Sequence, residues 1–403
     1  MRQLVVALAI PIFIVTNTND SGFGSLRDAM ESLSRQCIES SCEIRFAIPP
    51  PVPESGWFTI RPQSPLPSID ARTLVVDGAS QTSVTGDTNP NGPEIEINGG
   101  DCGDDCNGIV IALPVAAKGG REAHIENLAI NGFSGAGILV NLDRPAYFRT
   151  VIHRNYLGVD PTGTFAVPNL RGLMVSGALA LDIQENLISG NRLTGVWIAQ
   201  DDYPLVQANL IGVARDGETP LPNGASGIFF GPGTRFGAAF SNRIRFNRDF
   251  GIAVSRETQW MEIRGNSMKG NGQLGIDIGL DLITPTDAPV LISATFEAGK
   301  TIVRGRVAHN LGGDCLPCTP SLGIYSSTAL DAHGMTQGET QHVASIDFVA
   351  ADEFTATIDG DLTGRYVAAT ATRTKVLGKR VTPDYLQSWG ATSEFSNPVR
   401  VTP

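Results

Sequence analysis

The chain has 403 residues, of which 41% are hydrophobic and 18% charged, and its formal net charge is −11. This composition is ordinary for a globular protein and excludes a disordered chain. Because the balance is acidic and no basic run is longer than Lys379-Arg380, we expect no nucleic acid partner, and a neutral or cation-bridged ligand fits better.

The first residues combine a secretory-signal pattern with a strand pattern. Arg2 precedes an apolar run from Leu4 to Val15, which is the order of a signal peptide. Residues 12–16 also fit a first strand, so we assign residues 1–15 as a signal-like segment and first strand. No segment reaches the ~18 apolar residues that a membrane span needs, so we expect no transmembrane segment.

Residues 16–122 are interpreted as an N-terminal cap and the first coils of a solenoid. Ser25, followed three residues later by Asp28, predicts the start of a short helix that runs to about Leu33. A terminal coil needs such a cap because it otherwise exposes its apolar section. Short strands broken by proline and glycine then fill residues 44–111.

Residues 123–288 carry the repeat that predicts the solenoid. The pattern glycine, aliphatic residue, variable residue, large apolar residue occurs six times, and successive glycines lie 23 to 35 residues apart. This spacing suits one coil per repeat and about ten coils in all. The glycines are Gly137, Gly172, Gly195, Gly227, Gly251 and Gly275.

Asparagines form a second ladder in the same region. Pairs of asparagine five residues apart recur, with an apolar residue between them, and single asparagines occupy the first position in other coils. An asparagine amide at a turn can bond to the next coil, so we interpret the ladder as structural. Its members are Asn127, Asn155, Asn186, Asn191, Asn209, Asn242, Asn247, Asn266 and Asn271.

A longer period pairs two hairpins. Residues 155–169 match residues 209–223 without a gap, so long and short coils alternate. We therefore expect the hairpins at Gly163 and Gly217 to project from one edge, two coils apart, and to form one wall of a groove.

Residues 289–403 lose the repeat and alternate apolar with polar residues between turns. This pattern predicts an antiparallel, immunoglobulin-like β-sandwich that abuts the last coil.

The six cysteines fall in three close pairs, which indicates three loop-closing disulfides in an oxidising compartment and hence a secreted, extracellular or outer-surface location. Two alternatives remain open. The first is a redox motif, because Cys315 and Cys318 have its spacing. The second is a zinc site formed by Cys102, Cys106, Cys315 and Cys318, since four cysteines are enough ligands for one zinc ion. The pairs are Cys37 with Cys42, Cys102 with Cys106, and Cys315 with Cys318.

Several motifs carry a resemblance. Residues 13–22 (Phe-Ile-Val-Thr-Asn-Thr-Asn-Asp-Ser-Gly), residues 24–29 (Gly-Ser-Leu-Arg-Asp-Ala), residues 271–279 and the tail at 391–396 resemble bacterial secreted or surface right-handed parallel β-helix proteins with a C-terminal β-domain. The resemblance implies an all-β fold: a right-handed parallel β-helix with an N-terminal cap, followed by an antiparallel β-sandwich. It names no reaction. The acidic loop that such proteins often carry is reduced here to residues 281–287, so we expect no cofactor or metal, and Ca²⁺ is left open without a specific motif.

The third residue of each repeated strand should face outward, because strand side chains alternate. An external stripe rich in large apolar side chains suggests a ligand-binding surface, for which we choose Met174, Trp197, Phe229 and the nearby Tyr203. The alternative is that loops, the C-terminal domain or a second subunit cover the stripe, which would then support an oligomer. The stripe comprises Leu139, Met174, Trp197, Phe229, Ala253 and Asp277.

Weaker patterns would allow catalysis. Asp201 and Asp202 follow the Trp197 strand, and two carboxylates beside an aromatic residue suit a glycoside hydrolase; the alternative is a solvated turn. Further loop carboxylates are Asp160, Asp216 and Glu218. A lyase would need a basic residue as its catalytic base. The candidates, chosen by residue type alone, are Arg149, Arg154, Arg264 and Lys269. The five histidines show no metal-ligand spacing.

Three functions remain in order of preference. The first is a non-enzymatic, adhesin-like protein that binds carbohydrate or another surface ligand along the helix. The second is a polysaccharide hydrolase or lyase with acidic residues near Trp197. The third is a structural surface-display protein.

Overall fold

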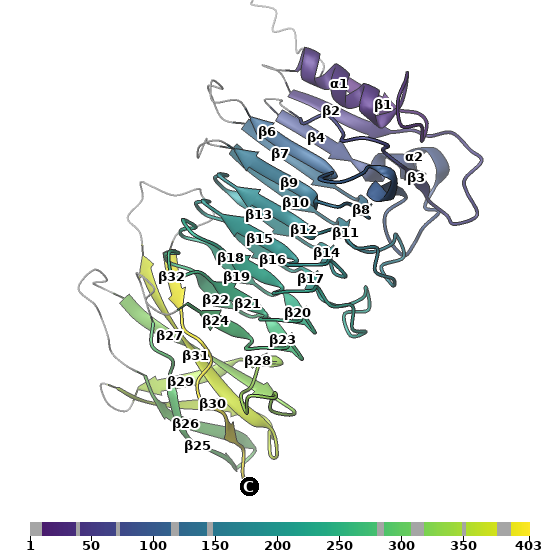
Figure 1. Cartoon of the computed structure of the whole chain (residues 1–403). Helices are drawn as coiled ribbons and strands as arrows, with labels where there is room; N and C mark the ends of the chain where they lie inside the picture. Colours follow the sequence, from purple (N-terminus) through teal and green to yellow (C-terminus); the bar gives the residue numbers. More distant parts are fainter. Residues whose placement is uncertain are drawn as a thin grey trace, which may run out of the picture.

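The computed structural model describes residues 10–37, 41–69, 73–113, 121–142, 148–279, 286–307, 318–348, 352–376 and 388–403. Up to residue 278 these residues form three parallel sheets that wind into one β-helix (Figure 1). We number these sheets 1, 2 and 3. From β4 onward successive strands belong to sheets 1, 2 and 3 in turn, so each of these coils contributes one strand to each sheet, whereas the first coils contribute β1 and β2 to sheet 1 and β3 to sheet 2.

The strands of the three sheets are short and in register between coils. Sheet 1 contains β1 (Ile12–Val15), β2 (Ser41–Phe46), β4 (Thr73–Asp77), β7 (Arg121–Glu126), β10 (Phe148–His153), β13 (Leu181–Gln184), β16 (Leu205–Gln207), β19 (Ala238–Phe240) and β22 (Glu262–Arg264). Sheet 2 contains β3 (Phe58–Ile60), β5 (Ile95–Asn98), β8 (Ala129–Asn131), β11 (Tyr156–Leu157), β14 (Leu187–Ile188), β17 (Leu210–Ile211), β20 (Arg243–Arg245) and β23 (Ser267–Lys269). Sheet 3 contains β6 (Ile109–Leu113), β9 (Ala136–Leu142), β12 (Arg171–Ser176), β15 (Val196–Ala199), β18 (Ile228–Phe230), β21 (Ile252–Val254) and β24 (Ile276–Ile278).

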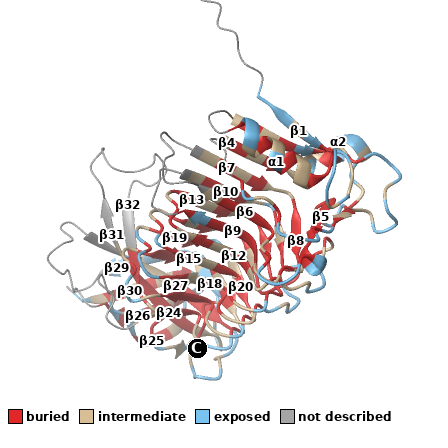
Figure 2. Ribbon diagram, turned by 45° about the horizontal axis from the view of Figure 1, so that its top comes forward, coloured by how far each residue is buried: buried red, intermediate tan, exposed pale blue. Residues whose placement is uncertain are grey.

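The core lies inside the coils and is built from stacked aliphatic columns. In sheet 2, Ile130, Leu157, Ile188, Ile211 and Ile244 follow one another in register and are fully buried. Burial of each such side chain stabilises the fold by about 2 kcal/mol. Figure 2 shows the buried residues running along the strands and the exposed ones gathering in the loops. Among the described residues the largest parallel sheet has nine strands, slightly fewer than the ten coils expected from the repeat spacing.

The asparagine ladder is confirmed as structural. Asn186, for example, donates from Nδ2 to Oδ1 of Asn209 at 3.0 Å, and Asn209 donates in the same way to Asn242 at 2.9 Å. One assignment was wrong. Asn127 occupies the left-handed turn position one residue earlier, with φ 57°, and Leu128 takes its place in the ladder, where its N–H donates to Asn155.

The N-terminal helix confirms its capping motif. α1 (Leu26–Gln36) begins after Ser25, whose side chain accepts from the Asp28 N–H. Its buried face includes Leu26, Met30 and Leu33, which join the same apolar core as the first coils. The helix therefore covers the open end of the solenoid, as Figure 1 shows. A second short helix, α2 (Thr82–Thr85), lies in the loop between β4 and β5.

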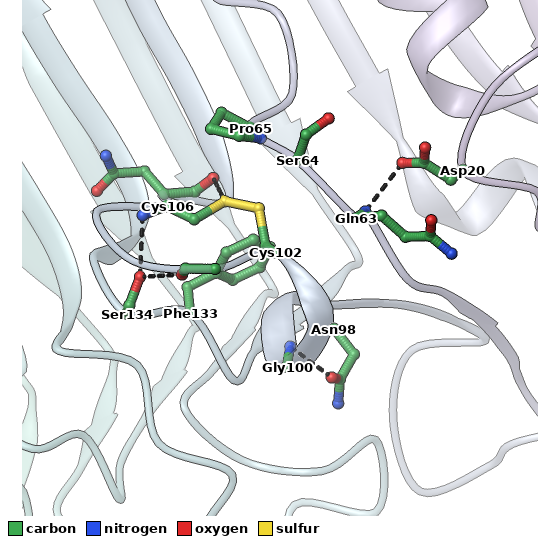
Figure 3. The surroundings of a disulfide bond; sticks show 12 residues. Asp20, Gln63, Ser64, Pro65, Asn98, Gly100, Cys102, Cys106, Phe133 and Ser134 are labelled. Carbon is green, nitrogen blue, oxygen red and sulfur yellow. Dashed lines mark hydrogen bonds between the residues drawn. A yellow bond between two sulfur atoms is a disulfide. The ribbon is translucent and has the colours of Figure 1, made fainter.

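Two of the three expected disulfides are present, Cys37–Cys42 and Cys102–Cys106. The second holds a loop against Phe133 and Ser134, where the Ser134 hydroxyl accepts from the Cys106 N–H and donates to the Gly103 carbonyl (Figure 3). Because Cys102 and Cys106 are bonded to each other, the four-cysteine zinc site is wrong. Cys315 and the side chain of Cys318 lie outside the described part of the chain, so the third pair stays a prediction.

The two hairpins project from one edge, two coils apart, as the 54-residue offset predicts. Val159 pairs antiparallel with Ala166 in the first, and Val213 with Pro220 in the second. The Arg215 N–H donates to the Gly163 carbonyl at 3.0 Å, so the hairpins contact each other across the shorter coil between them.

After β24 the sheets become antiparallel. One sheet contains β25 (Val290–Glu297), β26 (Lys300–Arg306), β30 (Glu353–Asp359) and β29 (Ala344–Phe348); the other contains β28 (Thr340–His342), β27 (Cys318–Ser327), β31 (Tyr366–Val376) and β32 (Ser388–Thr392), with β33 (Val399–Arg400) beside β31. Val303 and Phe354 of the first sheet share a buried cluster with Ile324 and Val367 of the second. The two sheets therefore form the expected sandwich.

The sandwich closes the open end of the helix by continuing its hydrogen bonding. Gln337 takes the next position in the asparagine ladder: its side-chain oxygen accepts from the Asn271 N–H at 2.8 Å, and its amide donates to the Asn271 carbonyl at 2.7 Å. Thr392 accepts from the Ile263 N–H in sheet 1, and Glu394 from the Ile278 N–H in sheet 3. All three sides of the last coil are thus engaged, since Met268 in sheet 2 donates to Gly338.

Candidate ligand-binding surface

The outward stripe forms one register column on sheet 3. Leu139, Met174, Trp197 and Phe229 are partners on successive strands, and Ala253 and Asp277 continue the column. The neighbours on each strand point inward: Val196 and Ile198 are fully buried on either side of Trp197. Alternation along the strand therefore places the third residue of each repeat outside.

Five of the six members of the stripe are partly exposed. Leu139, Met174, Trp197, Phe229 and Asp277 are neither buried nor fully accessible, whereas Ala253 is buried. The Trp197 and Phe229 rings lie 6.4 Å apart, centroid to centroid, with an interplanar angle of 32°. Aromatic pairs supply large apolar contact area with few rotatable bonds, which suits a binding surface.

The two carboxyls after Trp197 do not share a cleft. Asp201 is fully buried inside the coil, and neither of its oxygens has a hydrogen-bond partner. Burial, and next the charge of Asp202, raises the pKa of Asp201 well above its usual value. Asp202 faces the other way, where both of its oxygens accept from Arg235 at 2.7 and 2.6 Å. The turn therefore holds one interior acid, whose burial favours the neutral form, and one surface ion pair.

Tyr203 belongs to a second aromatic column that the sequence reasoning missed. Bridges align Asp202, Arg235 and Gln259 in successive coils, which puts the following residues, Tyr203, Phe236 and Trp260, one above another. All three have left-handed backbones, with φ of 66°, 56° and 57°, and the first two rings stack at 5.4 Å. The distances in sequence between Tyr203, Phe236 and Trp260 nearly equal those between the glycine-led strands of the same coils. This shared period is the sequence signal that would have revealed the second column.

Charged side chains cluster on the outer face of sheet 1. Arg149 contacts Glu122 at 2.5 Å and Asp182 at 3.9 Å, and His124 contacts Glu122 at 2.9 Å. Burial opposes ionisation of Glu122, but its bonds with His124 and Arg149 prevail and lower its pKa. Burial raises the pKa of Asp182, despite a hydrogen bond from Gln184 and the charge of Arg149.

The other lyase candidates are not brought together. Arg154 pairs with Glu185 at 2.9 Å, whereas Arg264 and Lys269 lie near the sandwich, paired with Glu262 and Glu339. Each is engaged in an ion pair and no two line a common site.

Within the described ranges, no group of three or more histidine, cysteine, aspartate and glutamate side chains could hold a metal ion. Residues 281–285 of the reduced acidic loop at 281–287, where Ca²⁺ was left open, lie outside those ranges. No helix among the described residues is long and apolar enough to cross a membrane.

Comparison with known proteins bears on the fold. Residues 114–281 match the family model described as a right handed beta helix region, which confirms the expected handedness and fold class for the central coils. No curated protein matches the sequence.

Two solved structures are similar over most of the chain. The Dettilon tailspike protein is 13% identical and covers 93% of this chain and 90% of its own, with a TM-score of 0.18. The enzymatically active domain of Bacteriophage CBA120 tailspike protein 2 is 9% identical and covers 94% and 76%, with a TM-score of 0.24. At such scores neither likeness bears on what this chain does.

Proposed function

We propose that the chain is a secreted or cell-surface, non-enzymatic protein that binds carbohydrate, or another surface ligand, on the outer face of sheet 3. The observation that carries the proposal is the partly exposed stripe of Leu139, Met174, Trp197 and Phe229 in consecutive coils. A sugar ring presents an apolar face of C–H bonds that can pack against the flat face of an aromatic ring, so an aromatic pair on a rigid sheet is a suitable platform. The two disulfides support an oxidising compartment.

The test is a glycan array followed by titration of the strongest ligand against the full chain and Trp197→Ala. We expect at least tenfold weaker binding, or about 1.4 kcal/mol, because the variant removes the larger ring of the pair. Phe23→Ala is the matched control, since Phe23 is 96% exposed and lies at the cap, away from sheet 3. An array without any ligand contradicts the proposal.

Oligomerisation through the stripe is the competing use of the same surface. If light scattering shows a dimer that Trp197→Ala dissociates, the stripe is a subunit interface and the ligand proposal is wrong.

A polysaccharide-degrading enzyme is the second candidate, and one observation favours it. On sheet 1, Glu122 and Asp182 share contacts with Arg149 while their pKa values shift in opposite directions, and such a difference is what an ionised and a protonated carboxyl need for acid–base work. Release of reducing ends from a panel of polysaccharides, abolished by Asp182→Asn, would establish this activity and refute the non-enzymatic proposal.

A further inference from the structure

A cleft of about 460 Å³ lies on a different side of the helix from the stripe. It spans the corner between sheets 1 and 2, where Arg154 and Glu185 occupy the turn and Tyr156 faces outward from β11. The loop that carries α2 forms one wall, and Arg215 of the second hairpin also lines the cleft, in contact with that loop. Figure 1 shows the loop and the hairpins projecting on the same side of the molecule. We call this feature the corner cleft.

Hydrogen bonds hold its walls in place. The loop at residues 87–93 is tied to the first hairpin because Asn89 Nδ2 donates to the Pro161 carbonyl at 3.0 Å. The Tyr156 hydroxyl donates to the Asn91 carbonyl at 2.8 Å, and Arg215 donates to the Asn91 side chain. The Tyr156 ring leaves no room beside it: a Cβ on Gly92 would meet the ring at 2.6 Å. The cleft is therefore preformed, which reduces the entropy lost on binding.

The charges of the lining favour an uncharged occupant over a polyanion. Three carboxylates, Asp87, Glu94 and Glu185, face two guanidinium groups, Arg154 and Arg215. Arg154 is paired with Glu185. Glu94 is nearly buried and already accepts from Thr82 at 2.6 Å and from the Thr88 N–H at 2.8 Å. The carboxylates outnumber the cations, so an acidic ligand meets repulsion.

Two groups are left to bind a ligand. In the described part of the chain, the Arg215 guanidinium contacts the amide oxygen of Asn91 and no carboxylate, which leaves most of its five N–H donors available. Asp87 is exposed at the rim and supplies acceptors. A hydroxyl both donates and accepts, so a ligand rich in hydroxyls and without charge matches this combination of a free donor set, a free acceptor and an aromatic side chain.

We propose that the corner cleft is a second binding site, specific for a neutral oligosaccharide, in which Arg215 and Asp87 hydrogen-bond the sugar hydroxyls. It rests on the proposed carbohydrate-binding function and adds a site and a ligand class to it. The cleft and the sheet 3 stripe would hold separate stretches of glycan.

The test is isothermal titration of the full chain with cellohexaose, mannohexaose and maltohexaose, and with hexagalacturonate as the acidic arm. We expect binding of a neutral probe that Arg215→Ala weakens at least tenfold. Because Arg215 also ties down the Asn91 loop, a second variant is needed: Ala79→Trp places a large ring at an exposed position of the lining and should block the cleft without removing a bond. Arg304→Ala, an exposed arginine on the sandwich, is the matched control and should bind normally.

The outcomes separate this proposal from the previous one. Neutral binding weakened in both cleft variants and also in Trp197→Ala supports the cleft as a second site beside the platform on sheet 3. Neutral binding lost in both cleft variants but unchanged in Trp197→Ala supports the cleft and overturns the platform. Neutral binding lost only in Trp197→Ala, or binding of hexagalacturonate alone, overturns the cleft and leaves the platform standing.

Discussion

At the scale of single residues, Asp201 shows how position along a solenoid changes the meaning of a side chain. It shares a turn with Asp202, yet one carboxyl points into the core and the other to the surface. A carboxyl that is buried without a partner is held protonated, because ionisation in the core is costly. The catalytic assignment of this pair treated both residues as surface acids, and no local motif distinguishes them.

Asp201→Asn should remove a pH dependence of stability. The raised pKa of Asp201 means that both states are protonated below the unfolded value of 3.8, so the carboxyl adds no pH dependence there. Above 3.8 the unfolded chain releases the proton and the folded chain keeps it, so the free energy of unfolding falls by up to about 1.4 kcal/mol per pH unit. Chemical denaturation at pH 3, 5 and 7 should therefore show that the free energy of unfolding of Asp201→Asn, relative to that of the natural chain, increases as the pH rises. Asp104→Asn, at an exposed position, should show no such gain, and parallel pH profiles for Asp201→Asn and the natural chain would contradict the assignment.

At the scale of elements, the asparagine ladder satisfies polar groups that the coil turns would otherwise bury unpaired. The Asn209 amide donates to the Ile183 carbonyl and to Asn242, and its oxygen accepts from both nitrogens of Asn186. Each rung thus serves the coil before it and the coil after it. A missing rung leaves groups in both neighbours without partners.

Asn209→Ala should lower the free energy of unfolding by about 3 kcal/mol, since each buried group left unpaired costs about 1–3 kcal/mol. Urea unfolding measures the loss. The control is Asn19→Ala, which alters an exposed asparagine in the cap loop and should change stability by less than about 0.5 kcal/mol. Equal effects of the two changes would mean that the ladder is not a source of stability.

At the scale of the whole molecule, helix and sandwich act as one unit because the sandwich supplies the last rung. Gln337 lies 66 residues beyond Asn271 in sequence and still continues the ladder. The same closure is needed in sheets 1 and 3, where Thr392 and Glu394 accept from the last coil. The sandwich thus covers the C-terminal end of the solenoid, as α1 covers the N-terminal end.

Gln337→Ala should show that the stability of the last coil depends on the sandwich. The variant leaves the Asn271 N–H and carbonyl unpaired at the junction, so we expect faster hydrogen exchange in residues 262–278 together with a loss of about 2 kcal/mol. Gln341→Ala, on the exposed part of β28, is the matched control. Unchanged exchange in the last coil of Gln337→Ala would show that the sandwich does not stabilise the helix through this contact.

The solenoid follows from the sequence alone, because a coil that repeats every 23 to 35 residues must stack its glycine-led strands, its asparagines and its inward aliphatic residues in register. Alternation along each strand also placed Trp197 and Phe229 outside, and an intact capping motif located α1. Four features became visible only in the folded chain. Asp201 turns inward, Tyr203, Phe236 and Trp260 form a column, Gln337 completes the ladder, and Arg215 contacts Asn91 at the corner cleft. The physical reason is that repeat patterns act between neighbouring coils at a fixed spacing, whereas these contacts join turns, inserts and a second domain, whose directions no local period specifies.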